Sequence, residues 1–202
     1  MHRWMIAAGA AAALMAGGAC AWAAATVGEP APAFTATDAD GKARSLDEFK
    51  GKYVVLEWFN NECPFVKKHY GSGNMQKLQA DWTGRGVIWL TIASSAPEKQ
   101  GHMTAAQANE VIKERGSRQT ALLLDGDGAV GKLYGAKTTP TMFVINPEGR
   151  LIYAGAIDSV ASPDPDDIQG ATNYVQQALQ ESMAGKPVSV AQTQSYGCFV
   201  KY

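Results

Sequence analysis

Residues 53–66 read YVVLEWFNNECPFV, and this stretch carries the clearest structural signal in the chain. The segment Tyr53–Phe59 is aliphatic or aromatic except at Glu57, which is typical of a strand buried on both faces. Pro64 favours the first position of a helix, so we expect Cys63 at the helix N-cap. The stretch therefore predicts a central strand that delivers a cysteine to the start of a helix.

Strand-like and helix-like segments alternate on the C-terminal side of this stretch. We predict further strands over 87–93, 120–124, 141–145 and 151–156, and helices over 64–70, 74–82, 104–115, 129–134 and 168–183. The turn Asn146–Gly149 makes the last two strands an antiparallel hairpin. Alternation that ends in such a pair predicts a single α/β domain with a central mixed sheet flanked by helices.

The first 25 residues predict a secretory signal peptide. His2 and Arg3 precede an apolar, alanine-rich stretch that falls short of the roughly 20 residues in a membrane-spanning helix, and small residues before Thr26 offer a cleavage site. Residues 26–186 would then form the folded domain and 187–202 a C-terminal tail without strong periodicity. We expect a periplasmic or secreted protein with no membrane partner. Lipidation of Cys20 is the alternative, although no large aliphatic residue precedes it where such sites carry one.

The charge and the cysteines narrow the classes of function. The net charge is -1 and no cluster of Lys or Arg stands out, so nothing indicates nucleic acid as a partner. Cleavage would leave Cys63 and Cys198 in an oxidising compartment. There Cys198 would be a resolving thiol for Cys63, a structural staple, or an intermolecular bridge, and the first two are favoured because the compartment promotes pairing.

Two local patterns bear on the reactivity of Cys63. A thiol at a helix start faces unpaired backbone N–H groups and the positive end of the helix dipole, which favours the nucleophilic thiolate. Lys67 and Lys68 follow within one turn and would add positive potential if their side chains turned back toward Cys63, but we expect both to be solvated helix lysines. Glu57 stands in an apolar strand. Burial there would raise its pKa and suit it to acid–base work, whereas a glutamate at a strand end would reach solvent.

Several motifs carry a family resemblance. Residues 28–56, the run Asn61–Lys67 and the run Thr138–Thr141 resemble the peroxiredoxin-like branch of the redoxin family of alkyl hydroperoxide reductases and thiol-specific antioxidants. The ending Gly197–Tyr202 is similar to a recurring C-terminus of that branch. The resemblance implies a thioredoxin-like fold, with Cys63 as the active thiol and Glu57 at the spacing of the acid that shuttles protons. It further implies a cis-proline at Pro140 that faces the thiol, and substrate contacts at Asn61, Pro64, Phe65 and Thr139.

The chain also departs from its relatives. Val66 replaces the second cysteine of a Cys-x-x-Cys motif, and Leu56 and Asn60 replace the proline and threonine of true peroxiredoxins. We therefore predict a thiol–disulfide oxidoreductase, with no cofactor or metal, in which Cys63 attacks and Cys198 resolves. Its partner would be a protein or small-molecule thiol or disulfide. The alternatives are a thiol-dependent peroxidase and a non-enzymatic module that binds a soft metal through Cys63, His69 and His102.

Overall fold

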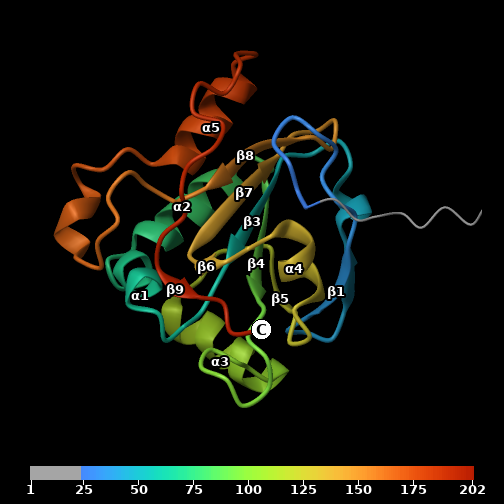
Figure 1. Cartoon of the computed structure of the whole chain (residues 1–202), viewed down its shortest axis with the longest axis vertical. Helices are drawn as coiled ribbons and strands as arrows, with labels where there is room; N and C mark the ends of the chain where they lie inside the picture. Colours follow the sequence, from blue (N-terminus) through green and yellow to red (C-terminus); the bar gives the residue numbers. More distant parts are fainter. Residues whose placement is uncertain (1–23) are drawn as a thin grey trace, which may run out of the picture.

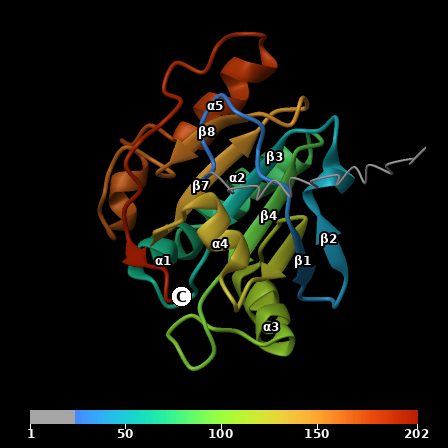
Figure 2. The ribbon, with the colours of Figure 1, turned by 45° about the vertical axis from the view of Figure 1, so that its right-hand side comes forward.

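The computed structural model describes residues 24–202, so Cys20 and nearly all of the predicted signal peptide lie outside the described residues. Seven strands form one mixed sheet in the order β2-β1-β5-β4-β3-β7-β8 (Figures 1 and 2). Strand β3 is parallel to β4 and antiparallel to β7, as expected for a central strand. The bounds are β1 Thr35–Asp38, β2 Ala43–Ser45, β3 Val54–Trp58, β4 Ile88–Ala93, β5 Ala121–Leu124, β7 Thr141–Ile145 and β8 Leu151–Gly155.

Helices cover both faces of the sheet. Buried residues of α1, α2, α3 and α5 pack on one face, and those of α4 pack on the other face together with Phe34 and Phe49. Figure 2 shows α4 on the near face. The bounds are α1 Pro64–Gly71, α2 Asn74–Thr83, α3 Ala105–Arg115, α4 Ala129–Tyr134 and α5 Tyr174–Met183, with short 3-10 turns at Leu46–Phe49 and Pro165–Ile168. The predicted α/β class with a central mixed sheet is confirmed.

The start of the last helix differs from the sequence-based expectation, whereas the start of α2 agrees with it. The last helix begins at Tyr174 rather than at residue 168, because the Asn173 side chain accepts the backbone N–H of Gln176 and caps it there. Helix α2 begins at Asn74 as expected, and its N-cap is Gly73, in the left-handed conformation that glycine tolerates. The amide of Asn74 lies 2.8 Å from the imidazole Nδ1 of His69.

The tail is not a loose end. Residues 191–202, here called the C-terminal strap, run from the region below α5 past α1 to the C-terminus (Figure 1). A two-stranded sheet joins β6, Thr138–Thr139, to β9, Cys198–Phe199, and the strap also pairs with β8, where Thr193 N–H donates to Ala154 O at 3.1 Å. At its end, the Tyr202 hydroxyl donates to Ala136 O at 2.6 Å. The strap is therefore attached along most of its length.

Candidate active site

Cys63 lies where the sequence pattern places it, after β3 and at the N-cap of α1. The first helical hydrogen bond runs from Lys67 N–H to Cys63 O at 2.9 Å, and Pro64 occupies the first helical position, where its missing N–H costs nothing. The thiol is fully buried, and its Sγ lies 3.1 Å from the carbonyl oxygen of Thr139. Helix α1 therefore presents the thiol to the β6 segment.

The strap brings the second cysteine to the same place. The Thr139–Pro140 peptide bond is cis, and Thr139 is the register partner of Cys198 in the β6–β9 pair. Because Thr139 also contacts the Cys63 thiol, the pairing brings Cys198 next to Cys63. Both are free thiols, Cys63 buried and Cys198 partly exposed. The structure thus joins Cys63, Thr139, Pro140 and Cys198 in one site.

The pKa values of the two thiols are shifted in opposite directions. Burial alone would raise the pKa of Cys63, but hydrogen bonds from the Cys198 side chain, the Val66 backbone and the Thr139 side chain together hold that pKa below its usual 9.0. Burial and the hydrogen bond to Cys63 raise the pKa of Cys198 to about 11. Cys63 is consequently the more acidic thiol of the pair, and Cys198 is the less acidic one.

Glu57 is fully buried in β3, so a solvent-exposed strand end is excluded. Its carboxylate accepts hydrogen bonds from four side chains: Tyr70 at 2.8 Å, Gln79 at 3.2 Å, Trp89 at 2.7 Å and Thr91 at 3.2 Å. Burial raises the pKa of Glu57, and these donors offset part of the rise. The carboxylate therefore ties α1 and α2 to the sheet, beneath the helix that carries Cys63.

The other expected substrate contacts surround the helix start. Asn61 accepts a hydrogen bond from Arg115 Nε at 3.0 Å and lines a polar hollow of about 290 Å³ beside α3. Pro64 is exposed and lines an open groove of about 460 Å³ between α1 and the loop at Pro163. The Phe65 ring is partly buried against Tyr196 of the strap, with centroids 5.7 Å apart.

The expectation that Lys68 is solvated is wrong, and His69 is fully buried as well. The Lys68 ammonium lies 3.5 Å from Asp158 Oδ2, and His69 Nε2 lies 3.7 Å from the same oxygen. The Asp158 carboxylate also accepts the hydroxyl of Tyr196. Sequence reasoning missed Asp158 and Tyr196, since no spacing or motif connects them to α1.

The metal alternative gains no support from this arrangement. Within residues 24–202, no three His, Cys, Asp or Glu side chains are placed to share a metal ion. His102 contacts the carbonyl oxygen of Ser95 at 3.0 Å instead. In the same part of the chain, no helix combines the length and apolarity needed to span a bilayer.

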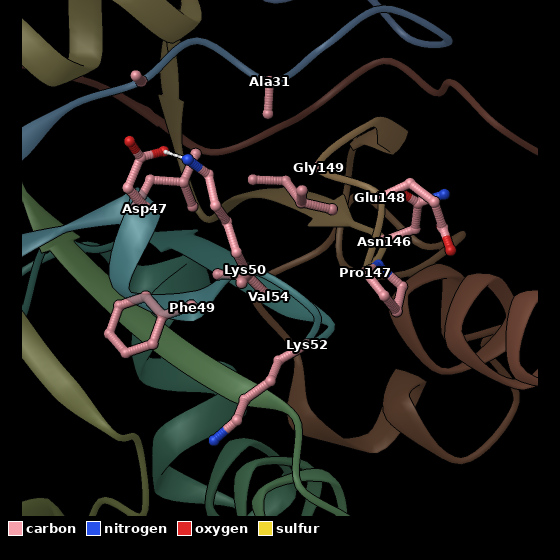
Figure 3. Close-up of a pocket in the computed structure, with 13 residues that line it drawn as sticks. Ala31, Asp47, Phe49, Lys50, Lys52, Val54, Asn146, Pro147, Glu148 and Gly149 are labelled. Atoms are coloured by element: carbon pink, nitrogen blue, oxygen red, sulfur yellow. Dashed lines mark ion pairs between the residues drawn. The ribbon is translucent and has the colours of Figure 1, made fainter.

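A further hollow of about 210 Å³ lies at the opposite end of β3 from Cys63 (Figure 3). Val54, the first residue of β3, lines it together with Phe49 and the turn at Asn146–Gly149. The ammonium of Lys50 at its rim is paired with Asp47 at 3.2 Å. Neither Cys63 nor Cys198 lines this hollow, and we place the chemistry at Cys63.

A mixed sheet with a thiol at the end of β3 and a cis-proline beside it defines a thioredoxin-like redox protein. Within that class, residues 27–154 match the model of the AhpC/TSA family, so the chain belongs to this family. Cys198 and the strap lie beyond the matched residues.

Known proteins agree with the class. The chain is 30% identical over 126 residues to the "Thiol-disulfide oxidoreductase ResA" of Bacillus thuringiensis subsp. konkukian, which covers 62% of this chain and 67% of that protein. A hypothetical protein from Sinorhizobium meliloti superposes with a TM-score of 0.77 and 28% identity, over 89% of this chain and 96% of its own. The thioredoxin domain of a Bacteroides vulgatus thiol-disulfide oxidoreductase has a TM-score of 0.53 and 20% identity, over 72% and 96%, which supports the fold alone.

Proposed function

We propose that this protein is an exported thiol–disulfide oxidoreductase in which Cys63 is the nucleophile and Cys198 the resolving thiol. The observation that carries the proposal is the β6–β9 register, which sets Cys198 against Cys63 in the absence of a Cys-x-x-Cys motif. The name of the Bacillus thuringiensis relative supports the same activity. Export rests on the first 25 residues of the sequence, and the domain limits 26–186 and 187–202 remain part of the proposal.

The chemistry is two successive thiol–disulfide exchanges. The Cys63 thiolate attacks one sulfur of a partner disulfide, forming a mixed disulfide and releasing the other sulfur as a thiolate. Cys198 then loses its proton and attacks Cys63 Sγ, which forms the Cys63–Cys198 bond and expels the second partner thiolate. The proton of Cys198, and the proton that Cys63 released when it ionised, end on the two released thiolates, so the partner gains two electrons and the protein loses two. A dithiol partner runs the same steps in reverse.

Other residues support these steps. The carbonyl oxygen and backbone of Thr139 and the cis-proline Pro140 would orient the incoming sulfur, and the hollows beside Asn61 and Pro64 would receive the adjoining atoms of the partner. Phe65 shapes the same surface. Glu57, with its raised pKa, would exchange protons within the buried network around Tyr70.

Oxidation of the purified, reduced protein by a small-molecule disulfide, followed by peptide mapping without reductant, tests the proposal. We expect an intramolecular Cys63–Cys198 disulfide, and we expect Cys198→Ala to accumulate a mixed disulfide at Cys63 because nothing resolves it. Cys63→Ala is the matched control and should form neither product. Two free thiols after oxidation, or a dimer linked through Cys198, would contradict the assigned roles.

A further inference from the structure

Cys63 is fully buried in the described structure, although the proposed chemistry requires it to meet a partner sulfur. Strand β9 of the strap lies on the β6 segment, whose Thr139 contacts the Cys63 thiol, and Cys198 of β9 adjoins that thiol. The strap lies very close to the body at this point: a Cβ on Gly197 would stand 2.0 Å from Thr139 O and 3.5 Å from the Phe65 Cβ. An external disulfide therefore reaches Cys63 after this part of the strap lifts.

A buried polar cluster fastens the strap next to the thiols. It consists of Lys68 and His69 on α1, Asp158 in the loop after β8, and Tyr196 on the strap, and we call it the strap latch. Asp158 Oδ1 accepts the Tyr196 hydroxyl and the backbone N–H of Val160, while Oδ2 faces the ammonium of Lys68 at 3.5 Å. Asp158 is 4% exposed, and the side chains of Lys68 and His69 are fully buried, so water competes little for these contacts.

The protonation states of His69 and Tyr196 allow the Tyr196 hydroxyl to donate its proton to Asp158. Burial lowers the pKa of His69 to about 4, so the ring is neutral near neutral pH, and its Nδ1 accepts from the amide of Asn74 at 2.8 Å. The remaining ring proton then lies on Nε2, which faces Asp158. Burial and the carboxylate raise the pKa of Tyr196 far above its usual value, so its hydroxyl keeps the proton that it donates.

Tyr196 connects this cluster to both cysteines. It precedes Cys198 by two residues, and its ring packs against Phe65, which follows Cys63 by two residues. Lifting Cys198 off Cys63 therefore moves Tyr196, and withdrawing the Tyr196 hydroxyl leaves the buried Oδ1 of Asp158 with the Val160 N–H as its remaining hydrogen-bond donor among the described residues.

We propose that Tyr196, held by Asp158, is a positioning residue that keeps the strap on Cys63 and thereby sets how often the nucleophile opens to partner disulfides. The role given to the latch rests on the proposed function. The contact between Tyr196 and Asp158 is nevertheless present in the reduced protein and can be tested without any turnover. Asp158 acts through Tyr196, and neither group takes part in bond exchange.

The rate at which iodoacetamide alkylates Cys63 in the fully reduced protein tests the latch. A buried thiol is modified from its opened state, so the rate at Cys63, read peptide by peptide by mass spectrometry, reports the opening equilibrium. Tyr196→Phe keeps the ring on Phe65 and removes the hydroxyl. A hydrogen bond to a charged group carries enough free energy for us to expect alkylation faster by about tenfold or more.

Two comparisons distinguish loss of the contact between Tyr196 and Asp158 from a general loosening of the fold. Tyr53→Phe removes a similar hydroxyl contact, 2.9 Å from Ser182 Oγ and away from the strap, and should leave the Cys63 rate within about twofold of wild type. Asp158→Ala should also speed alkylation, and the double variant should be no faster than the faster single variant, since both remove the same contact. Circular dichroism melting confirms that each variant is folded at the assay temperature.

The results that would overturn the latch differ from those that would overturn the proposed function. An unchanged Cys63 rate in Tyr196→Phe, an equal acceleration in Tyr53→Phe, or fully multiplicative effects of Tyr196→Phe and Asp158→Ala would each overturn the latch. Absence of the Cys63–Cys198 disulfide in oxidised wild-type protein would instead overturn the proposed function, while the alkylation rates of the reduced protein would still report on the latch.

Discussion

Replacing Glu57 by glutamine exchanges one oxygen of a buried carboxylate for an amide NH2 group in the centre of the protein. The carboxylate receives four donors, three of them (Gln79, Trp89 and Thr91) at Oε2 and the Tyr70 hydroxyl at Oε1. Glutamine offers one acceptor oxygen and one amide that donates. With its oxygen at the Oε2 position, its amide would face Tyr70, whose hydroxyl already accepts from Gln79 at 3.1 Å.

The Tyr70 proton is then left without its acceptor in a fully buried place. One stranded donor costs about 1–3 kcal/mol, and for a domain of this size each kcal/mol lowers the melting temperature by about 2–4 °C. We therefore expect Glu57→Gln to lower the melting temperature by about 2–12 °C near neutral pH.

The stability lost in Glu57→Gln should be larger at acid pH than at neutral pH. Burial raises the pKa of Glu57 above its ordinary value of 4.5, so the folded protein binds this proton more tightly than the unfolded chain. The stabilisation from this proton is complete below pH 4.5 and disappears as the pH rises through the folded pKa. Glu57→Gln has no such proton. The stability gap between wild type and variant should therefore be widest at acid pH and narrow toward neutral pH.

Thermal unfolding followed by far-ultraviolet circular dichroism, at several pH values between about 4.5 and 8, measures both effects. Glu110→Gln is the matched control, because Glu110 is exposed on α3 and the same substitution there should change little. A Glu57→Gln variant that melts with the wild type at every pH would refute the reasoning. Disulfide exchange assays on the same samples then show whether the pH profile of the reaction also shifts, as a proton-exchanging role requires.

Three further outcomes are expected. Gly197→Ala would place a Cβ 2.0 Å from the Thr139 carbonyl oxygen at a φ of +116°, so it should open the β6–β9 pair and speed iodoacetamide alkylation of Cys63 by about fivefold or more. The control Gly185→Ala, at a φ of +70° with open space around it, should leave that rate unchanged, and equal rates in the two variants would contradict the argument. Cys198→Ala should raise the pKa of Cys63, measured by the ultraviolet absorbance of the thiolate, because a hydrogen bond that lowers it is lost, and an unchanged or lower pKa would count against that bond. Cys63→Ser should abolish disulfide exchange with the fold retained, since serine is well accepted at a helix N-cap, and residual exchange would place the nucleophile elsewhere.

The sequence alone determined the parts of the site that depend on neighbouring residues. The apolar run before Cys63 specifies β3, Pro64 specifies the start of α1, and together they put a thiol at a helix N-terminus. The α3 helix between Thr104 and Gly116 follows from its capping residues in the same way. The cis bond before Pro140 was implied by family resemblance and is present.

The tertiary structure alone decided which distant residues meet. The tail has no periodicity, yet Gly197 lets it lie on the Thr139 carbonyl, and this contact brings Cys198 to Cys63. Lys68 has the sequence context of a solvated helix lysine and is buried because Asp158, from a loop far along the chain, neutralises it. Helix caps and strand periodicity act between residues close in sequence, and local patterns can predict them. Charge pairing and strap closure act between segments that are adjacent only after the sheet has formed.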